Sequence, residues 1–350
     1  MDDQALIRTY GNTDLPEGTR DRPLVTFALF AYNQEKYIRE AVEGAFSQTY
    51  SPLEIILSDD CSSDRTFEIM EEMAREYRGP HTVRVRRNDV NLGTSLHVQM
   101  SFAQSMGRLF IVAAGDDISV EERVEKIVAA WLKNCCGPAL LHSGMVQFEN
   151  ERCKVKRVRR LIGADGSLKG FVSDWKMPAL APTCAYSREI FEHFPPLSGG
   201  SLIEDLPLMV RSLAIARLIY VDEPLVFARK LPCSAGQGFS VLAPKRWNKF
   251  VHSRITALND IVRDADFFPS ENSKETHDLR RKALTKISSH AKLLVDYGKP
   301  PSFARRLILF NQFVFGAALS GSLGERIKFA ITFCFPSVKR LKVKLDLVKQ

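Results

Sequence analysis

The chain has 350 residues, of which 45% are apolar and 26% are charged. This composition excludes collagen-like, disordered and disulfide-scaffold proteins, and the length suits one large domain or two smaller ones. No run of about 18 apolar residues occurs, which argues against a conventional membrane span. The first residues are acidic and no apolar stretch follows them, so we expect no secretory signal there.

The basic residues gather at one end of the chain. Residues 299–350 hold ten Lys or Arg and two Asp or Glu, so this tail carries the whole net charge of +8. The neutral remainder argues against a nucleic-acid binder. Seven cysteines without a Cys-x-x-Cys pair indicate free thiols in a reducing, cytoplasmic compartment.

Residues 1–22 are polar and predict an irregular lead-in. Apolar, β-prone runs then alternate with segments whose apolar residues repeat at helical spacing. We expect strands at 24–30, 53–57, 82–86 and 109–113, and helices at 35–47, 65–77, 95–106 and 121–133. Strands and helices that alternate with short links predict an open, mostly parallel α/β sheet flanked by helices.

The pattern changes after residue 138. We expect a strand at 139–148, a helix at 202–216, and short strands at 218–221 and 225–228. Further on, the chain is polar and helical in character, and the basic tail is amphipathic. This predicts a main domain at 23–235 with halves at 23–118 and 119–235, a helical extension at 236–298, and the tail at 299–350.

Two aspartate pairs, Asp59–Asp60 and Asp116–Asp117, each follow a predicted buried strand. Ligands of open α/β sheets bind at the carboxyl ends of strands. Paired carboxylates there can hold a divalent cation, which can bridge a diphosphate and neutralise its leaving charge. The alternative is that each pair only caps the next helix, whose positive end favours acidic residues.

Several short motifs, in this order, resemble the inverting glycosyltransferases of family 2. They are VTFALFAYN at 25–33, AFSQTY at 45–50, LEIILSDDCSSDRT at 53–66, NLG at 91–93, AGDD at 114–117, IEDL at 203–206 and DEPLV at 222–226 with Arg229. The resemblance covers about residues 23–235. It implies the GT-A fold and the transfer of one sugar, with inversion, from a nucleotide-diphosphate sugar to an acceptor hydroxyl.

The resemblance also implies roles for individual residues. It places Asp116 and Arg229 at the donor diphosphate, and Asp117, together with Asp116, as ligands of a divalent cation, Mg or Mn. Residues 23–118 become the donor-nucleotide half and 119–235 the acceptor half. The residues that would bind the nucleotide are Ala31, Tyr32, Asn33, Asp60 and Asn91.

The Glu-Asp motif at 204–205 implies the catalytic base. Asp205 would take the proton from the acceptor hydroxyl as its oxygen attacks the anomeric carbon. Glu204 stands beside it in the same motif. The alternative is that Asp205 caps the helix and that Glu204 is solvated.

The sequence departs from the family pattern near the end of the main domain. Members often have a His two residues after the Arg that aligns with Arg229, and Leu231 stands there. Its loss leaves open a catalytically weakened protein that binds a membrane surface. No Gln-x-x-Arg-Trp motif occurs, which argues against a processive synthase. A nucleotide-sugar pyrophosphorylase is also considered, but residues 30–34 lack its Gly-rich basic loop.

Apolar stretches of the tail lie beside Lys and Arg clusters, as in segments that dock on anionic membranes. The alternative is a tail that packs on the main domain. Membrane docking would suit a glycan or lipid-linked glycan acceptor, which the resemblance associates with the assembly of O-antigen, capsule or exopolysaccharide. We therefore expect a cytoplasmic protein, peripheral on the inner face of the membrane.

Overall fold

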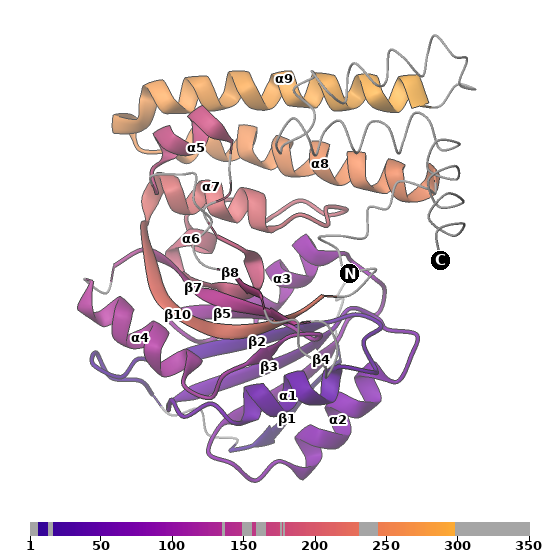
Figure 1. Cartoon of the computed structure of the whole chain (residues 1–350), viewed down its shortest axis with the longest axis vertical. Helices are drawn as coiled ribbons and strands as arrows, with labels where there is room; N and C mark the ends of the chain where they lie inside the picture. The colour runs from indigo at the N-terminus through magenta and orange to yellow at the C-terminus, as the bar shows by residue number, and fades with distance from the viewer. Residues whose placement is uncertain are drawn as a thin grey trace, which may run out of the picture.

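The computed structural model describes residues 6–12, 17–134, 137–148, 156–158, 166–175, 177, 179–230 and 244–297. The tail at 299–350, with its expected membrane contact, lies outside these residues. The described chain forms one ten-stranded mixed sheet with helices on both faces (Figure 1). The strand order is β1-β4-β3-β2-β5-β9-β7-β10-β6, and β8 pairs with β7.

The strands are β1 (Leu6–Gly11), β2 (Val25–Ala31), β3 (Leu53–Asp59), β4 (Thr82–Arg87), β5 (Leu109–Ala114), β6 (Ile118–Ser119), β7 (Ala139–Phe148), β8 (Lys156–Val158), β9 (Cys184–Ser187) and β10 (Arg217–Arg229). The helices are α1 (Ile38–Phe46), α2 (Thr66–Glu76), α3 (Thr94–Ala103), α4 (Arg123–Lys133), α5 (Leu168–Asp174), α6 (Glu189–Glu192), α7 (Asp205–Ile215), α8 (Pro244–Asp264) and α9 (Ser273–Tyr297).

Strands β2 to β5 form the parallel centre of the sheet, and their side chains are buried on both faces. This explains their continuous apolar runs. One core cluster joins the sheet to α1, α2 and α4, and a second joins the opposite face to α3 and α5–α9. The predicted α/β sheet is confirmed, and these strands and helices begin and end within a few residues of their predicted positions.

The second half of the sheet is mixed. Strand β9 runs antiparallel between β5 and β7, and β10 runs parallel to β7. The short strands expected at 218–221 and 225–228 are one strand, β10, with register shifts between Val221 and Val226. The end of β10 pairs with β6, which follows the second aspartate pair directly. This pairing returns β10 to the edge where that pair lies.

The lead-in expected at 1–22 is not irregular throughout. Residues 6–11 form β1, which pairs antiparallel with β4 from Leu6 opposite Arg87 to Gly11 opposite Thr82. Most side chains of β1 are exposed, so the sequence carries no buried apolar pattern there. The side chains of Arg8 and Tyr10 bond Glu71 of α2, which attaches this edge strand to the domain.

Helices α8 and α9 form the helical C-terminal segment that the sequence predicts and lie together over α7 (Figure 1). Arg211 of α7 and Asp264 of α8 form a buried ion pair with a nitrogen–oxygen distance of 2.7 Å. Apolar residues of α8 and α9 belong to the same core cluster as α7. The extension is therefore packed into the domain. No helix in the described ranges is both long and apolar enough to cross a bilayer.

Candidate active site

Both aspartate pairs lie at the carboxyl edge of the sheet, on either side of the end of β2. Asp59 is the last residue of β3, and the Asp60 N–H donates to the carbonyl of Ala31, 3.0 Å away. On the other side, the Gly115 N–H donates to the carbonyl of Phe30 at 2.8 Å. Because both loops are bonded to the last two residues of β2, the two pairs flank one strand end.

The loops that follow β2 and β3 are bonded to each other. The Asn33 N–H donates to Ser62 Oγ at 2.9 Å, and Asn33 Oδ1 accepts from the Ser63 N–H at 2.8 Å. Asn33 and the free cysteine Cys61 both have positive φ, 53° and 61°. Such conformations persist only where the surroundings enforce them, often at binding sites. Tyr32 is 48% exposed at this surface, so its ring is open to a ligand.

The Asp60 carboxylate accepts hydrogen bonds from four donors of its own chain. Its Oδ1 accepts from Asn88 Nδ2 at 2.7 Å and from the Leu92 N–H at 2.9 Å. Its Oδ2 accepts from Asn91 Nδ2 and from the Gly93 N–H, both at 3.0 Å. A carboxylate has about four acceptor positions, and all are used here. Asp60 therefore folds the loop at 88–93, and Gly93, at φ 76°, takes a conformation that favours glycine.

Asp116 and Asp117 have fewer donors. Asp117 Oδ1 accepts from the backbone N–H of Arg229 at 2.9 Å. Burial, and then the charge of Asp116, raise the pKa of Asp117 to about 7. Burial also raises the pKa of Asp116. Two adjacent carboxylates, with Asp117 buried and Asp116 half-buried, resist ionisation, and a cation from outside would remove that penalty.

The structure brings Arg229 next to this pair. Its Nε donates to the backbone oxygen of Asp116 at 3.3 Å, and Nη2 bonds Glu40 at 3.0 Å. The guanidinium lies over the rings of Tyr37 and Phe148, 4.9 and 4.5 Å from their centroids. The side chain is thereby fixed, and part of its charge faces the acidic pair.

A buried arginine that sequence reasoning missed lies behind Asp117. Arg123, in the first turn of α4, is fully buried and donates to Ser119 Oγ, the Val112 carbonyl and the Pro182 carbonyl. Burial lowers its pKa to about 10, so it stays charged at neutral pH, where its charge opposes the rise in the pKa of Asp117. An arginine in a helical first turn gives no sequence signal for burial.

Glu204 and Asp205 begin α7 and are half-buried. Burial, and then the charge of Asp205, raise the pKa of Glu204 to about 8. Burial also raises the pKa of Asp205. The charge of Arg254 of α8 and the hydrogen bond from the Leu206 N–H act in the opposite direction and lower this pKa. Glu204 occupies the N-cap position without a side-chain cap hydrogen bond, so simple capping does not account for it. Arg254 is the second site residue that the sequence did not indicate.

The aspartate pair fits a cation shared with a substrate. No three His, Cys, Asp or Glu side chains within the described ranges are grouped to hold a metal on their own. Mg²⁺ is commonly held by one or two carboxylates together with substrate phosphates and water. Asp116 and Asp117 are adjacent carboxylates that can both supply oxygen ligands. Burial raises the pKa of both because little positive charge compensates them, so this pair suits such a cation.

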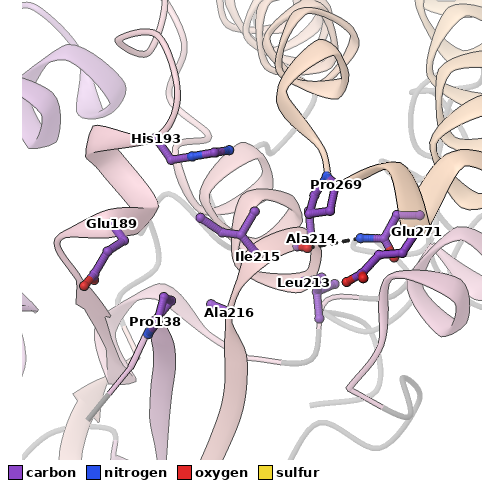
Figure 2. Close-up of a pocket in the computed structure, with 10 residues that line it drawn as sticks. Pro138, Glu189, His193, Leu213, Ala214, Ile215, Ala216, Pro269 and Glu271 are labelled. Atoms are coloured by element: carbon purple, nitrogen blue, oxygen red, sulfur yellow. Dashed lines mark hydrogen bonds between the residues drawn. The ribbon is translucent and has the colours of Figure 1, made fainter.

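A hollow of about 610 Å³ lies elsewhere, between the ends of α6 and α7 and the turn before α9 (Figure 2). Its wall includes Pro138, which precedes β7 and therefore marks the amino edge of that strand. Asn272, which also lines the hollow, donates from Nδ2 to the Ala214 carbonyl at 3.1 Å. The hollow is thus separate from the carboxyl edge, where the aspartates lie.

Part of the chain is similar to known glycosyltransferases. The family described as "Glycosyl transferase family 2" matches residues 26–194. An uncharacterized glycosyltransferase of Haemophilus influenzae is 34% identical over 112 residues, which are 32% of this chain and 34% of that protein. The putative teichuronic acid biosynthesis glycosyltransferase TuaG of Bacillus subtilis is 25% identical over 118 residues, 34% of this chain and 46% of that protein. The chain spans less than half the length of these curated relatives.

Among solved structures, residues 1–349 of S. aureus TarS, in complex with UDP-GlcNAc, share the fold with a TM-score of 0.55. The identity is 14%, and the match covers 90% of this chain and 91% of that one. This likeness shows the expected GT-A α/β fold, with a helical C-terminal segment. Residues 26–194, which include the strands that carry both aspartate pairs, match glycosyl transferase family 2, and the chain has the fold expected of that family.

Proposed function

We propose that the chain transfers a single sugar from a nucleotide-diphosphate sugar to an acceptor hydroxyl, with inversion at the anomeric carbon. The observation that carries this proposal is the underneutralised pair Asp116–Asp117 beside Arg229, at the carboxyl edge of a family 2 domain. An acidic pair that is buried at Asp117 and half-buried at Asp116, next to a fixed guanidinium, suits a ligand that is itself a cation–diphosphate complex.

Asp117, with Asp116, would hold Mg or Mn against the diphosphate. Such a cation supplies charge neutralisation for the departing nucleoside diphosphate. Arg229 would add a fixed positive charge to the same group, and Arg123 would support Asp117 from behind. The fixed position of Arg229 between Tyr37 and Phe148 offers a substitute for the His that the family often has two residues later.

The nucleotide would lie over the interlocked loops after β2 and β3. Ala31, Tyr32 and Asn33 stand at this surface, with the Tyr32 ring exposed for contact with the base. Asp60 and Asn91 would act mainly through the loop at 88–93, because the Asp60 carboxylate already accepts four hydrogen bonds. Their part in donor binding is then to shape the pocket wall.

Asp205 would be the general base. It would take the proton of the acceptor hydroxyl while that oxygen bonds to the anomeric carbon, and the bond from that carbon to the diphosphate oxygen would break. Attack on the side opposite the leaving group inverts the configuration. Glu204, with a pKa of about 8, would keep its proton at neutral pH and leave the negative charge to Asp205.

We further propose that the acceptor is a surface glycan or its lipid-linked precursor, assembled at the inner face of the membrane. Support comes from the teichuronic acid pathway in the name of one relative and from the basic, amphipathic sequence at 299–350. Such a tail would bring the enzyme to the surface that bears a lipid-linked acceptor.

The first experiment is thermal unfolding with UDP, GDP, dTDP and CDP, each with and without Mn²⁺ or Mg²⁺. A ligand at a hundred times its dissociation constant stabilises a protein by about 2.7 kcal/mol. We expect a cation-dependent rise in Tm with one nucleotide. In a second assay, the chain should release that nucleoside diphosphate from the corresponding nucleotide sugar. UDP-GlcNAc is the first donor to test because the fold neighbour binds it.

The variant Asp117→Ala should lose the cation-dependent rise. Asp222→Ala removes an exposed carboxylate of β10 and should keep it. If no nucleotide stabilises the native chain with either cation, the donor site is not functional, and the weakened membrane-surface protein becomes the better account.

A further inference from the structure

The loop that leads into Glu204 and Asp205 is held by helix α8 of the extension. The Leu202 N–H donates to Ser253 Oγ, and Ser201 Oγ donates to the Ser253 carbonyl, both at 3.2 Å. Ser253 is fully buried. Because these bonds lie two to three residues before Glu204, the position of α8 fixes where the two carboxylates stand.

The same loop is also bonded to the donor half. The Ser95 N–H, in the first turn of α3, donates to the Ser201 carbonyl at 3.2 Å. Two residues earlier, the Gly93 N–H donates to Asp60. Ser201 therefore joins α8 on one side to the loop organised by Asp60 on the other. A continuous set of hydrogen bonds links the extension, the candidate base and the nucleotide loop.

The residue that follows Ser253 is an arginine, Arg254, whose charge acts on the candidate base. Arg254 is half-buried, and its guanidinium lies 5.5 Å from the centroid of the Phe250 ring on the same helix. The charge of Arg254 is the main influence that lowers the pKa of Asp205 against the effect of burial. In turn, burial lowers the pKa of Arg254 and the charge of Asp205 raises it. The two side chains therefore sense each other's charge.

Within the described residues, the other titratable groups that interact electrostatically with Asp205 do not supply positive charge. Glu204 adjoins it on the chain. Cys184 and Tyr186 come from β9. Burial raises the pKa of Cys184 to about 12 and that of Tyr186 well above its ordinary value, so both stay neutral at pH 7. In the part of the chain that the structure describes, Arg254 is then the cation that acts on Asp205, and the influences on the pKa of Glu204 do not include it.

We propose that α8 is part of the catalytic site, with Arg254 as a positioning residue that keeps Asp205, rather than Glu204, as the ionised carboxylate. This inference rests on the proposed function, in which Asp205 is the base. Ser253 fixes the carboxylates in space and Arg254 fixes their charge. Without Arg254 the pair would hold its proton to higher pH, and the base would be protonated under conditions where the native enzyme works.

The charge pairing is tested first without any substrate, on the full chain at pH 8. Arg254→Gln should lower Tm because it leaves the buried carboxylate uncompensated. Adding Asp205→Asn should recover most of that loss, since the carboxylate is then gone. The control is Arg263→Gln, which removes another arginine of α8 that pairs with Asp260 and Asp264. Asp205→Asn should recover nothing there. Simple additivity of Arg254→Gln and Asp205→Asn would overturn the proposal.

The catalytic part is tested by the pH dependence of nucleoside diphosphate release from the nucleotide sugar that the panel identifies. Arg254→Gln should move the acid limb of the profile up by about one to two pH units, and Arg254→Lys should restore part of the shift. The cation-dependent Tm rise with nucleotide should persist in both variants. If Arg254→Gln lowers the rate equally at every pH and leaves the acid limb of the profile in place, Arg254 has only a structural role and the inference is refuted.

The two parts separate the inference from the proposed function. If no nucleotide binds the native chain, the proposed function fails, and recovery of Tm by Asp205→Asn still decides whether Arg254 pairs with Asp205. If the native chain binds and turns over its donor but Arg254→Gln has a native profile, the proposed function stands and this inference falls. Should Arg254→Gln not fold, Arg254→Lys carries both measurements.

Discussion

The two aspartate pairs look alike in sequence and differ in the folded chain. Each follows a buried parallel strand and flanks the end of β2. Asp60 accepts four hydrogen bonds from residues 88–93, whereas the bonds described to Asp117 include one backbone donor, Arg229. In the first pair, other residues of the chain therefore use the acceptor positions of Asp60. The second pair retains acceptor positions for a ligand.

This difference separates a carboxylate that builds a site from one that binds. A carboxylate with all its acceptor positions filled by the chain contributes to stability. A carboxylate that is buried beside a like charge lowers stability unless a cation is bound. Destabilising arrangements of this kind are common at functional sites. Substitutions at the two pairs should accordingly act in opposite directions on the nucleotide-free protein.

The largest effect is expected from Asp60→Ala. It would leave four donors without their acceptor, including the backbone N–H groups of Leu92 and Gly93. Hydrogen bonds to charged groups contribute about 1.5–3 kcal/mol each but are not additive, so we expect a loss of about 3–5 kcal/mol in the free energy of unfolding. Urea denaturation measures this loss.

Asp89→Ala is the matched control for that loss. It removes the same charge from the same loop, but Asp89 is exposed. Surface substitutions of this kind usually change stability by less than about 0.5 kcal/mol. Equal losses in both variants would show that Asp60 does not organise the loop, and the contrast between the two pairs would disappear.

The sequence could not reveal this contrast, because the partners of each pair lie far away along the chain. Asp60 is filled from residues about thirty positions later, and Asp117 meets Arg229, over a hundred positions on. The parallel core was predictable from its apolar runs, since both faces of those strands are buried. The resemblance alone implied that both pairs contact the donor, with Asp60 at the nucleotide and Asp116 and Asp117 at the diphosphate and its cation.

The features that the sequence missed share a physical cause. Strand β1 has mostly exposed side chains, and β6 and β9 are only two and four residues long. Arg123 and Arg254 belong to amphipathic helices, where an arginine is ordinarily solvated. Their burial is decided by tertiary packing, which local periodicity does not encode.

The second prediction concerns Asp117→Asn. In the native protein the cation and nucleotide should add about 2.7 kcal/mol at a hundred times the dissociation constant, and this variant should lose that gain. Without ligand, it should be more stable than the native chain at pH 8 and similar at pH 4. The native carboxylate ionises with a pKa of about 7 instead of 3.8, so it lowers stability as pH rises through that range. Denaturation at both pH values tests this, and a variant less stable at pH 8 would contradict it.

A smaller effect is expected from Arg229→Lys. Lysine keeps a positive charge but loses the planar stacking on Tyr37 and Phe148 and the bond to Glu40. Stacking of this kind contributes about 0.5–1 kcal/mol for each ring, so we expect a loss of about 1–2 kcal/mol in unfolding free energy. Weaker nucleotide binding should accompany it. Glu40→Gln, which removes only the half-exposed ion pair, should leave both quantities nearly native.

The last prediction, which sharpens the comparison most, concerns the pH dependence of Glu204→Gln. The folded chain holds the Glu204 proton up to a pH of about 8, while the unfolded chain releases it near 4.5. The native protein therefore loses stability from this group as pH rises between those values, and glutamine, which resembles the protonated acid, does not. The variant should nearly match the native chain at pH 4.5 and should be more stable than the native chain at pH 8.5. A constant difference across this range would show that Glu204 ionises normally and that the pair at 204–205 resembles Asp59–Asp60 more than Asp116–Asp117.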